Sequence, residues 1–197
     1  MNSKRHKNTM FGHLVLVFIF LICIGLDQYT KILARKFLKG KEDVIFLPKL
    51  IKFTYLEGGN TGAAWGMFSG HAMGLLVFNG IFILLVIGLM VRTYLRIARG
   101  AFPSPSMTKY YITSGVVVMI LSGALGNCID RILYGSVTDF ITFIFIDFPI
   151  FNLADIFIVV GMIAIMIIFL FVITEQSFHW IFSFRPEKNQ SRKEKSE

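Results

Sequence analysis

Four long blocks of apolar sequence dominate the pattern of this chain. They cover residues 11–26, 72–91, 110–129 and 156–174, and none of them contains Asp, Glu, Lys or Arg. A helix needs about 20 apolar residues to cross the hydrocarbon core of a bilayer, and each block comes near this length. The pattern therefore predicts an all-α membrane protein with four transmembrane helices, organised as one integral membrane domain over residues 1–197.

The Lys and Arg residues predict the orientation of these helices. Twelve of them fall in the amino terminus, the loop between the second and third blocks and the carboxy-terminal tail, against eight in the two other loops. Cytoplasmic loops of membrane proteins carry the excess of Lys and Arg. Both termini are therefore predicted to be cytoplasmic, and the basic tail over residues 185–197 is expected to touch anionic lipid.

Two shorter stretches fall on the opposite, extracytoplasmic side. Apolar and polar residues alternate over residues 51–55, which is typical of a strand with one wet face. Residues 140–151 are strongly apolar, but Asp147 and Pro149 interrupt them and the stretch is too short to span a bilayer. We expect both stretches to form small β or interfacial elements, either as a roof over a site or as lipid anchors.

The composition excludes most soluble classes of protein. The chain is 55% hydrophobic and only 16% charged, whereas soluble domains are about 25% charged. Its net charge of +8 favours membrane phospholipid rather than nucleic acid as a partner. The two cysteines, Cys23 and Cys128, form no CxxC pair, so we expect no metal site and no cofactor. A monomer is the expected state.

Polar residues gather where the predicted helices meet the outer face. The clusters cover residues 27–31, 60–65, 127–131 and 152–155, and Asp139 lies in the loop between the last two. Charged groups at this depth are unfavourable unless they are paired, hydrated or functional. Any chemistry is therefore predicted at the outer boundary between membrane and water.

Pairing within the structure is the alternative explanation for some of these residues. Asp27 and Lys31 are four residues apart and would be neighbours on one face of a continuing helix. Asp130 and Arg131 can share a network with Asn127, which lies one turn earlier. These contacts are as compatible with helix packing as with chemistry.

Carboxylates are the candidate catalytic groups. No Gly-x-Ser-x-Gly or His-Glu-x-x-His motif accompanies the four histidines, which argues against serine hydrolase and zinc protease chemistry. Two aspartates held close together can share a proton, so that one acts as a base on water while the other stays an acid. Asp155 opens the fourth block with Asn152 placed to cap or orient it. Asp139 lies sixteen residues before Asp155, in a loop that could fold back, so the spacing permits a dyad.

Five segments give the chain a close resemblance to a known family. They are residues 27–31 (DQYTK), 60–66 (NTGAAWG), 123–131 (GALGNCIDR), 137–140 (VTDF) and 151–155 (FNLAD). In this order they resemble the signature blocks of lipoprotein signal peptidase, also called signal peptidase II. The resemblance runs from Asp27 to the fourth apolar block.

The resemblance implies an aspartic endopeptidase of the bacterial cytoplasmic membrane, with its active site at the extracytoplasmic face. Its substrates would be diacylglyceryl-modified prolipoproteins, cut immediately before the lipidated cysteine. The two catalytic aspartates of the family fall on Asp139 and Asp155. The same transfer implies supporting or substrate-contacting roles for Asp27, Lys31, Asn60, Gly62, Asn127, Asp130, Arg131 and Asn152.

The chain also departs from the family pattern, and other interpretations exist. Thr138 replaces the usual Val before Asp139, and Asp147 is an extra acid in the following loop. Asp130 is the main rival for a catalytic role, because its block is at least as distinctive as that of Asp139. A non-enzymatic transporter or a lipid-binding assembly factor is the alternative function. Transport would predict charged residues in mid-span or symmetric helix breaks, and the four blocks have neither.

Overall fold

The computed structural model describes residues 3–62, 72–98 and 107–171 of the chain. Four long helices lie within these ranges: α1 (Ser3–Phe37), α2 (Ala72–Ala98), α3 (Met107–Tyr134) and α4 (Leu153–Phe171). Each is long and apolar enough to cross a membrane, which confirms the predicted fold class. The end of the fourth predicted block, the basic tail, Trp65 and part of its signature block lie outside the described residues.

The helices extend beyond the apolar blocks at the end where the polar clusters lie. The first helix, α1, continues past Leu26 to Phe37, and α3 continues past Ile129 to Tyr134. Both helices can continue past their apolar blocks because the polar side chains that follow have partners inside the protein. The ion pair between Asp27 Oδ2 and Lys31 Nζ, at 2.9 Å, is one such contact, and it confirms the predicted pairing.

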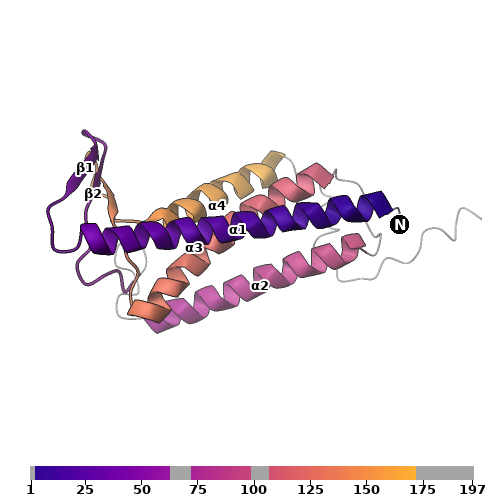
Figure 1. Ribbon diagram of the computed structural model, residues 1–197, viewed down its shortest axis with the longest axis horizontal. Coiled ribbons are helices and arrows are strands. Elements are labelled where there is room, and N and C mark those ends of the chain that lie inside the picture. Colours follow the sequence, from indigo (N-terminus) through magenta and orange to yellow (C-terminus); the bar gives the residue numbers. More distant parts are fainter. Residues whose placement is uncertain (1–2, 63–71, 99–106, 172–197) are drawn as a thin grey trace, which may run out of the picture.

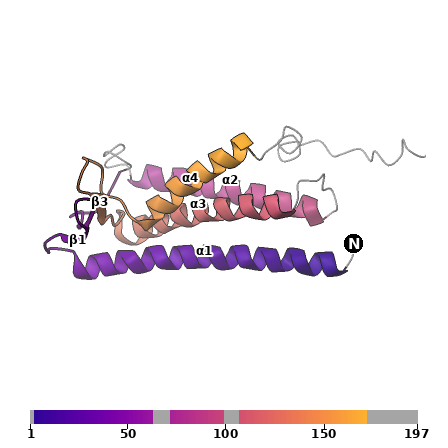
Figure 2. The same cartoon turned by 90° about the horizontal axis from the view of Figure 1, so that it is seen from above.

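The third helix, α3, packs against each of the other three helices (Figures 1 and 2). Its contact with α4 depends on small residues. A Cβ atom at Gly123 would collide with the main-chain oxygen of Ala154, and one at Gly161 would collide with the side chain of Ile120. Small residues let helix backbones approach closely inside a membrane. The close contact brings the start of α4 beside the polar end of α3.

The outward surfaces of α2 and α4 are apolar. Phe78 and Leu84 on α2, and Leu170 on α4, are among many exposed large hydrophobic side chains. Exposed apolar area on this scale marks a surface that contacts something other than water. Together with the four apolar helices, this surface fits a multi-pass membrane protein.

A three-stranded antiparallel sheet lies at the end of the bundle away from the amino terminus (Figure 1). Its strands are β1 (Val44–Leu47), β2 (Ile51–Phe53) and β3 (Ile141–Phe143), in the order β1-β2-β3. The strand β2 confirms the strand predicted from the alternation over residues 51–55, but it ends at Phe53. The central register places Lys52 opposite Thr142. The sheet thus joins the loop after α1 to the loop after α3.

The apolar stretch after α3 folds back on itself. Ile141 N donates to the main-chain oxygen of Phe151 at 2.8 Å, and Phe151 N donates to Ile141 O at 2.9 Å. These bonds close the loop between Ile141 and Phe151, so the chain folds back as the spacing of Asp139 and Asp155 permits. They bring Asn152 and the start of α4 next to Asp139.

Candidate active site

Asp139 lies in the segment that joins α3 to β3, and only 2% of its surface is exposed. Its Oδ2 atom accepts a hydrogen bond from Asn60 Nδ2 at 2.8 Å, and its Oδ1 atom accepts one from Asn152 Nδ2 at 2.6 Å. The main-chain oxygen of Asp139 accepts a further bond from Leu56 N at 3.2 Å. Both the backbone and the carboxylate of Asp139 are therefore fixed.

Asp155 lies in the first turn of α4, and Asn152 caps this helix. Asn152 Oδ1 accepts from Asp155 N at 3.2 Å, while Asp155 Oδ2 accepts from Asn152 N at 3.0 Å. These reciprocal bonds form a capping box at the helix start, which is the arrangement expected from the spacing. The other carboxylate oxygen, Asp155 Oδ1, accepts from Asn127 Nδ2 at 2.9 Å.

Asn152 links the two aspartates that the sequence singled out. Its side-chain amide donates to Asp139 and its backbone N–H donates to Asp155. The environment of Asp139 raises its pKa to about 6. Burial is the main cause and the nearby charge of Asp155 adds to it, while the hydrogen bonds from Asn60 and Asn152 act in the opposite direction. Two carboxyl groups that share one environment in this way suit acid–base chemistry.

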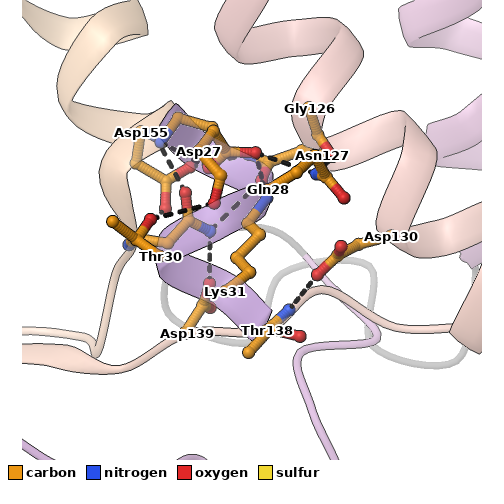
Figure 3. A network of polar contacts seen from close by, with 12 residues as sticks. Asp27, Gln28, Thr30, Lys31, Gly126, Asn127, Asp130, Thr138, Asp139 and Asp155 are labelled. Atoms are coloured by element: carbon orange, nitrogen blue, oxygen red, sulfur yellow. Dashed lines mark hydrogen bonds and ion pairs between the residues drawn. The ribbon is translucent and has the colours of Figure 1, made fainter. Parts of the chain in front are cut away.

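Lys31 provides a buried positive charge beside the two aspartates. Its side chain is fully buried; it pairs with Asp27 at 2.9 Å and donates to Asn127 Oδ1 at 2.8 Å. Asn152 Nδ2 also donates to Asn127 Oδ1, at 3.1 Å. With two donors on its oxygen, the Asn127 amide must turn its nitrogen toward Asp155. Figure 3 shows Lys31 of α1, Asn127 of α3 and Asp155 of α4 gathered in one place.

Asp27 ties α1 to both neighbouring helices. Its Oδ1 atom accepts from Ala154 N at 3.0 Å, in the first turn of α4. Gln28 Nε2 donates both to Asp27 Oδ2 at 3.0 Å and to the main-chain oxygen of Gly126 in α3 at 3.1 Å (Figure 3). A carboxylate that is paired and hydrogen-bonded on both oxygens is compensated inside a protein. Asp27 therefore fixes helix positions and carries the countercharge of Lys31.

Asn60, Gly62 and Arg131 form a second group next to Asp139. Gly62 N donates to Asn60 Oδ1 at 2.9 Å, which leaves the Asn60 amide nitrogen to bond Asp139. Arg131 Nη2 donates to the main-chain oxygen of Gly62 at 2.9 Å. The Nε atom of Arg131 is buried, and within the described ranges it has no hydrogen-bond partner.

Asp130 belongs to a separate branch of the network. Its nearest cation is Arg35 of α1, at 3.4 Å, and its Oδ2 atom accepts from Thr138 N at 2.9 Å. Arg35 also donates to Thr138 Oγ1 at 2.6 Å. Asp130 is fully buried, and these contacts compensate its charge inside the protein.

Comparison with known proteins gives the same family as the sequence motifs. Residues 19–171 match the family model described as signal peptidase (SPase) II. The chain belongs to the signal peptidase II family. A relative named lipoprotein signal peptidase, from Staphylococcus carnosus, is 37% identical over 80% of this chain and 91% of its own length. The protein of that name from Enterococcus faecalis is 35% identical over 78% of this chain and 88% of its own length.

Solved structures are similar as well. Two chains, each described as a bacterial membrane enzyme studied by the in meso method, match the fold. The one at 2.3 Å resolution has a TM-score of 0.60 and 32% identity, and covers 79% of this chain and 87% of its own. The one at 1.9 Å has a TM-score of 0.62 and 28% identity, over 81% of this chain and 94% of its own.

The structure of this signal peptidase II family member places all ten predicted site residues in the described part of the chain. Two aspartates, Asp139 and Asp155, share Asn152, while Asp130 and Arg131 bond to other partners. No group of three or more His, Cys, Asp or Glu that could hold a metal ion occurs among residues 3–62, 72–98 and 107–171.

The sequence motifs do not predict two further residues of this network, Arg35 and Thr138. Arg35 lies outside the signature blocks, and Thr138 differs in the sequence only as a departure from the family pattern. One signal was available for Arg35: it follows Lys31 by four residues, so it continues the polar face of α1.

Proposed function

We propose that this chain is a membrane aspartic endopeptidase that removes the signal peptide from diacylglyceryl-modified prolipoproteins, cutting immediately before the lipidated cysteine. The observation that supports this most is the pair of aspartates, Asp139 and Asp155, that both bond to Asn152. Membership of the signal peptidase II family disfavours a transporter or a lipid-binding assembly factor. The relatives' name, lipoprotein signal peptidase, supports the substrate class.

In this mechanism Asp155 takes a proton from the attacking water. It lies at the amino-terminal end of α4, where the helix dipole favours negative charge, and it accepts bonds from Asn127 and from the Asn152 backbone. Asp139, whose pKa is raised to about 6, is the acid. It donates its proton to the scissile carbonyl oxygen while the water oxygen bonds to the carbonyl carbon, which gives a tetrahedral intermediate. When the C–N bond then breaks, Asp155 protonates the leaving amine and a hydroxyl of the intermediate returns a proton to Asp139. The two protons that move come from Asp139 and from water, and no covalent intermediate forms on the enzyme.

The proposed orientation places both termini in the cytoplasm and the aspartate pair at the extracytoplasmic face. It is supported by the twelve Lys and Arg residues in the segments assigned to the cytoplasm, against eight on the other side. A substrate of this class has its signal helix in the bilayer and its acylated cysteine at the outer interface. A site at the rim of the bundle could cut there without extracting the lipid. We further propose that the enzyme acts as a monomer in contact with phospholipid.

A direct assay tests the proposed function. Purified protein in detergent micelles is incubated with a diacylglyceryl-modified prolipoprotein and, separately, with its unlipidated form, and the products are identified by mass spectrometry. We expect cleavage of the lipidated precursor alone, at the bond before the modified cysteine. Lack of cleavage of either form, or cleavage at another bond, would contradict the proposal.

A further inference from the structure

We propose that Arg35 and Thr138 are positioning residues: their hydrogen bond holds the segment that presents Asp139 to the substrate. This inference rests on the proposed function, because it assigns Arg35 and Thr138 to the reaction only through Asp139. It concerns residues outside the predicted site set.

The contact itself is short and largely buried. Arg35 Nη1 donates to Thr138 Oγ1 at 2.6 Å, and 5% of the Thr138 surface is exposed. The guanidinium of Arg35 also lies over the ring of Tyr134, 4.3 Å from its centroid, at the last residue of α3. Arginine presents several N–H donors in a fixed planar fork, so it can bond one group while it stacks on another. Arg35 thus connects the end of α1 to the end of α3 and to the segment beyond it.

Asp130 provides a second link between Arg35 and Thr138. Its carboxylate, which is fully buried, accepts from Thr138 N at 2.9 Å and pairs with Arg35 at 3.4 Å. Both the backbone and the side chain of Thr138 are therefore held by the Arg35–Asp130 pair. Networks of this kind restrict geometry when every member has a partner.

The opposite side of the same short segment is held by backbone bonds. Val137 N donates to Asn60 O at 2.9 Å, Asn60 N donates to Val137 O at 2.8 Å, and Leu56 N donates to Asp139 O. With these bonds on one side and Arg35 and Asp130 on the other, the peptide before Asp139 has little freedom to rotate. Loss of the Arg35–Thr138 bond would leave only the Asp130 bond on that side and let the carboxylate of Asp139 move away from Asn152. Displacements of about 1 Å in a catalytic group can lower a rate substantially.

A single substitution at Thr138 tests whether the Arg35–Thr138 hydrogen bond matters. Val has nearly the shape of Thr without the hydroxyl. Thr138→Val therefore removes the hydrogen bond and should still fold. In Thr138→Val the Arg35 guanidinium loses its short hydrogen bond and keeps its longer contact with Asp130, so we expect it to move closer to Asp130 and to weaken the bond from Thr138 N. Replacing Arg35 as well removes that competition.

The experiment is a double-mutant cycle with kcat and KM measured separately on the lipidated precursor. We expect Thr138→Val and Arg35→Leu each to lower kcat about five- to tenfold with KM changed less than about twofold, and the double variant to fall no further than the worse single variant. Thr138→Ser keeps the hydroxyl and should stay within about twofold of wild type. Thr142→Val on β3 and Lys36→Leu on the exposed face of α1 are matched controls that should leave kcat unchanged.

The outcomes separate this inference from the proposed function. Wild-type kcat in Thr138→Val, a multiplicative loss in the double variant, or failure of Thr138→Ser to retain activity would each overturn the positioning role. A purely structural role would lower the melting temperature without the selective loss of kcat and without the Ser rescue. Asp139→Asn is measured in the same assay. Full activity of Asp139→Asn refutes the proposed function, whereas an inactive Asp139→Asn with a fully active Thr138→Val overturns the positioning inference alone.

Discussion

The side-chain amide of Asn152 lies 2.6 Å from Asp139 Oδ1, and the same residue caps α4. These two tasks can be separated, because Ser is about as good a helix cap as Asn but cannot reach a second carboxylate. Asn152→Ser is therefore expected to keep the melting temperature within a few degrees of wild type while turnover falls about 10²-fold, as for a lost catalytic hydrogen bond. Thermal unfolding in micelles and turnover of the lipidated precursor measure the two effects. If turnover is retained, Asn152 acts as a cap alone.

The raised pKa of Asp139 predicts a pH dependence. Its carboxyl group must be protonated to act as the acid, and the protonated form is lost as the pH rises through about 6. We therefore expect kcat/KM for the lipidated precursor to decline above about pH 6, by about tenfold for each further unit once the acid form is scarce. A profile that rises steadily to pH 8 would mean that Asp139 is not the acid.

The buried pair of Lys31 and Asp27 predicts a large loss of stability when it is broken from one side. Lys31→Met leaves the fully buried Asp27 carboxylate without its countercharge, which is expected to lower the free energy of unfolding by about 3–5 kcal/mol. The double variant Asp27→Asn, Lys31→Met removes both charges and should recover part of this loss. Chemical denaturation in mixed micelles measures the difference. Equal stability of the two variants would show that the charges are not coupled.

Gly126 of α3 lies against the side chain of Asp27 in α1. A Cβ atom there would collide with the carboxylate of Asp27, so Gly126→Ala should displace Asp27 from Lys31 and lower both stability and turnover. Overpacking of this kind lowers stability by about 1–3 kcal/mol. Gly80→Ala in α2 is the control, since a Cβ atom at Gly80 meets nothing within 4 Å. The control variant should be neutral or more stable by up to about 1 kcal/mol. An equal response of the two variants would refute the steric explanation.

Much of the fold follows from local sequence. The four apolar blocks predict the four helices because length and hydropathy suffice for a membrane span. The alternation around Ile51 and Lys52 predicts β2 for a similarly local reason. The cap of α4 by Asn152 also depends only on residues three positions apart.

The partners of Asp130 and Arg131 could not be predicted in the same way. The two residues are adjacent in sequence, which suggests a shared network, but adjacent positions on a helix point to different faces. Asp130 faces α1 and pairs with Arg35, which is 95 positions away, while Arg131 bonds the main chain of Gly62. These contacts depend on how α3 rotates against α1, and no local pattern records that rotation.

The most direct test compares three carboxylate variants in one assay. Asp139→Asn and Asp155→Asn each remove one member of the proposed pair, and Asp147→Asn removes an exposed acid from the loop between them. With folding checked by melting temperature, we expect turnover of the lipidated precursor to fall at least about 10³-fold in each of the first two variants and to remain at the wild-type level in Asp147→Asn. Substantial turnover in Asp139→Asn, together with loss of turnover in Asp130→Asn, would contradict the account and move the catalytic role to Asp130.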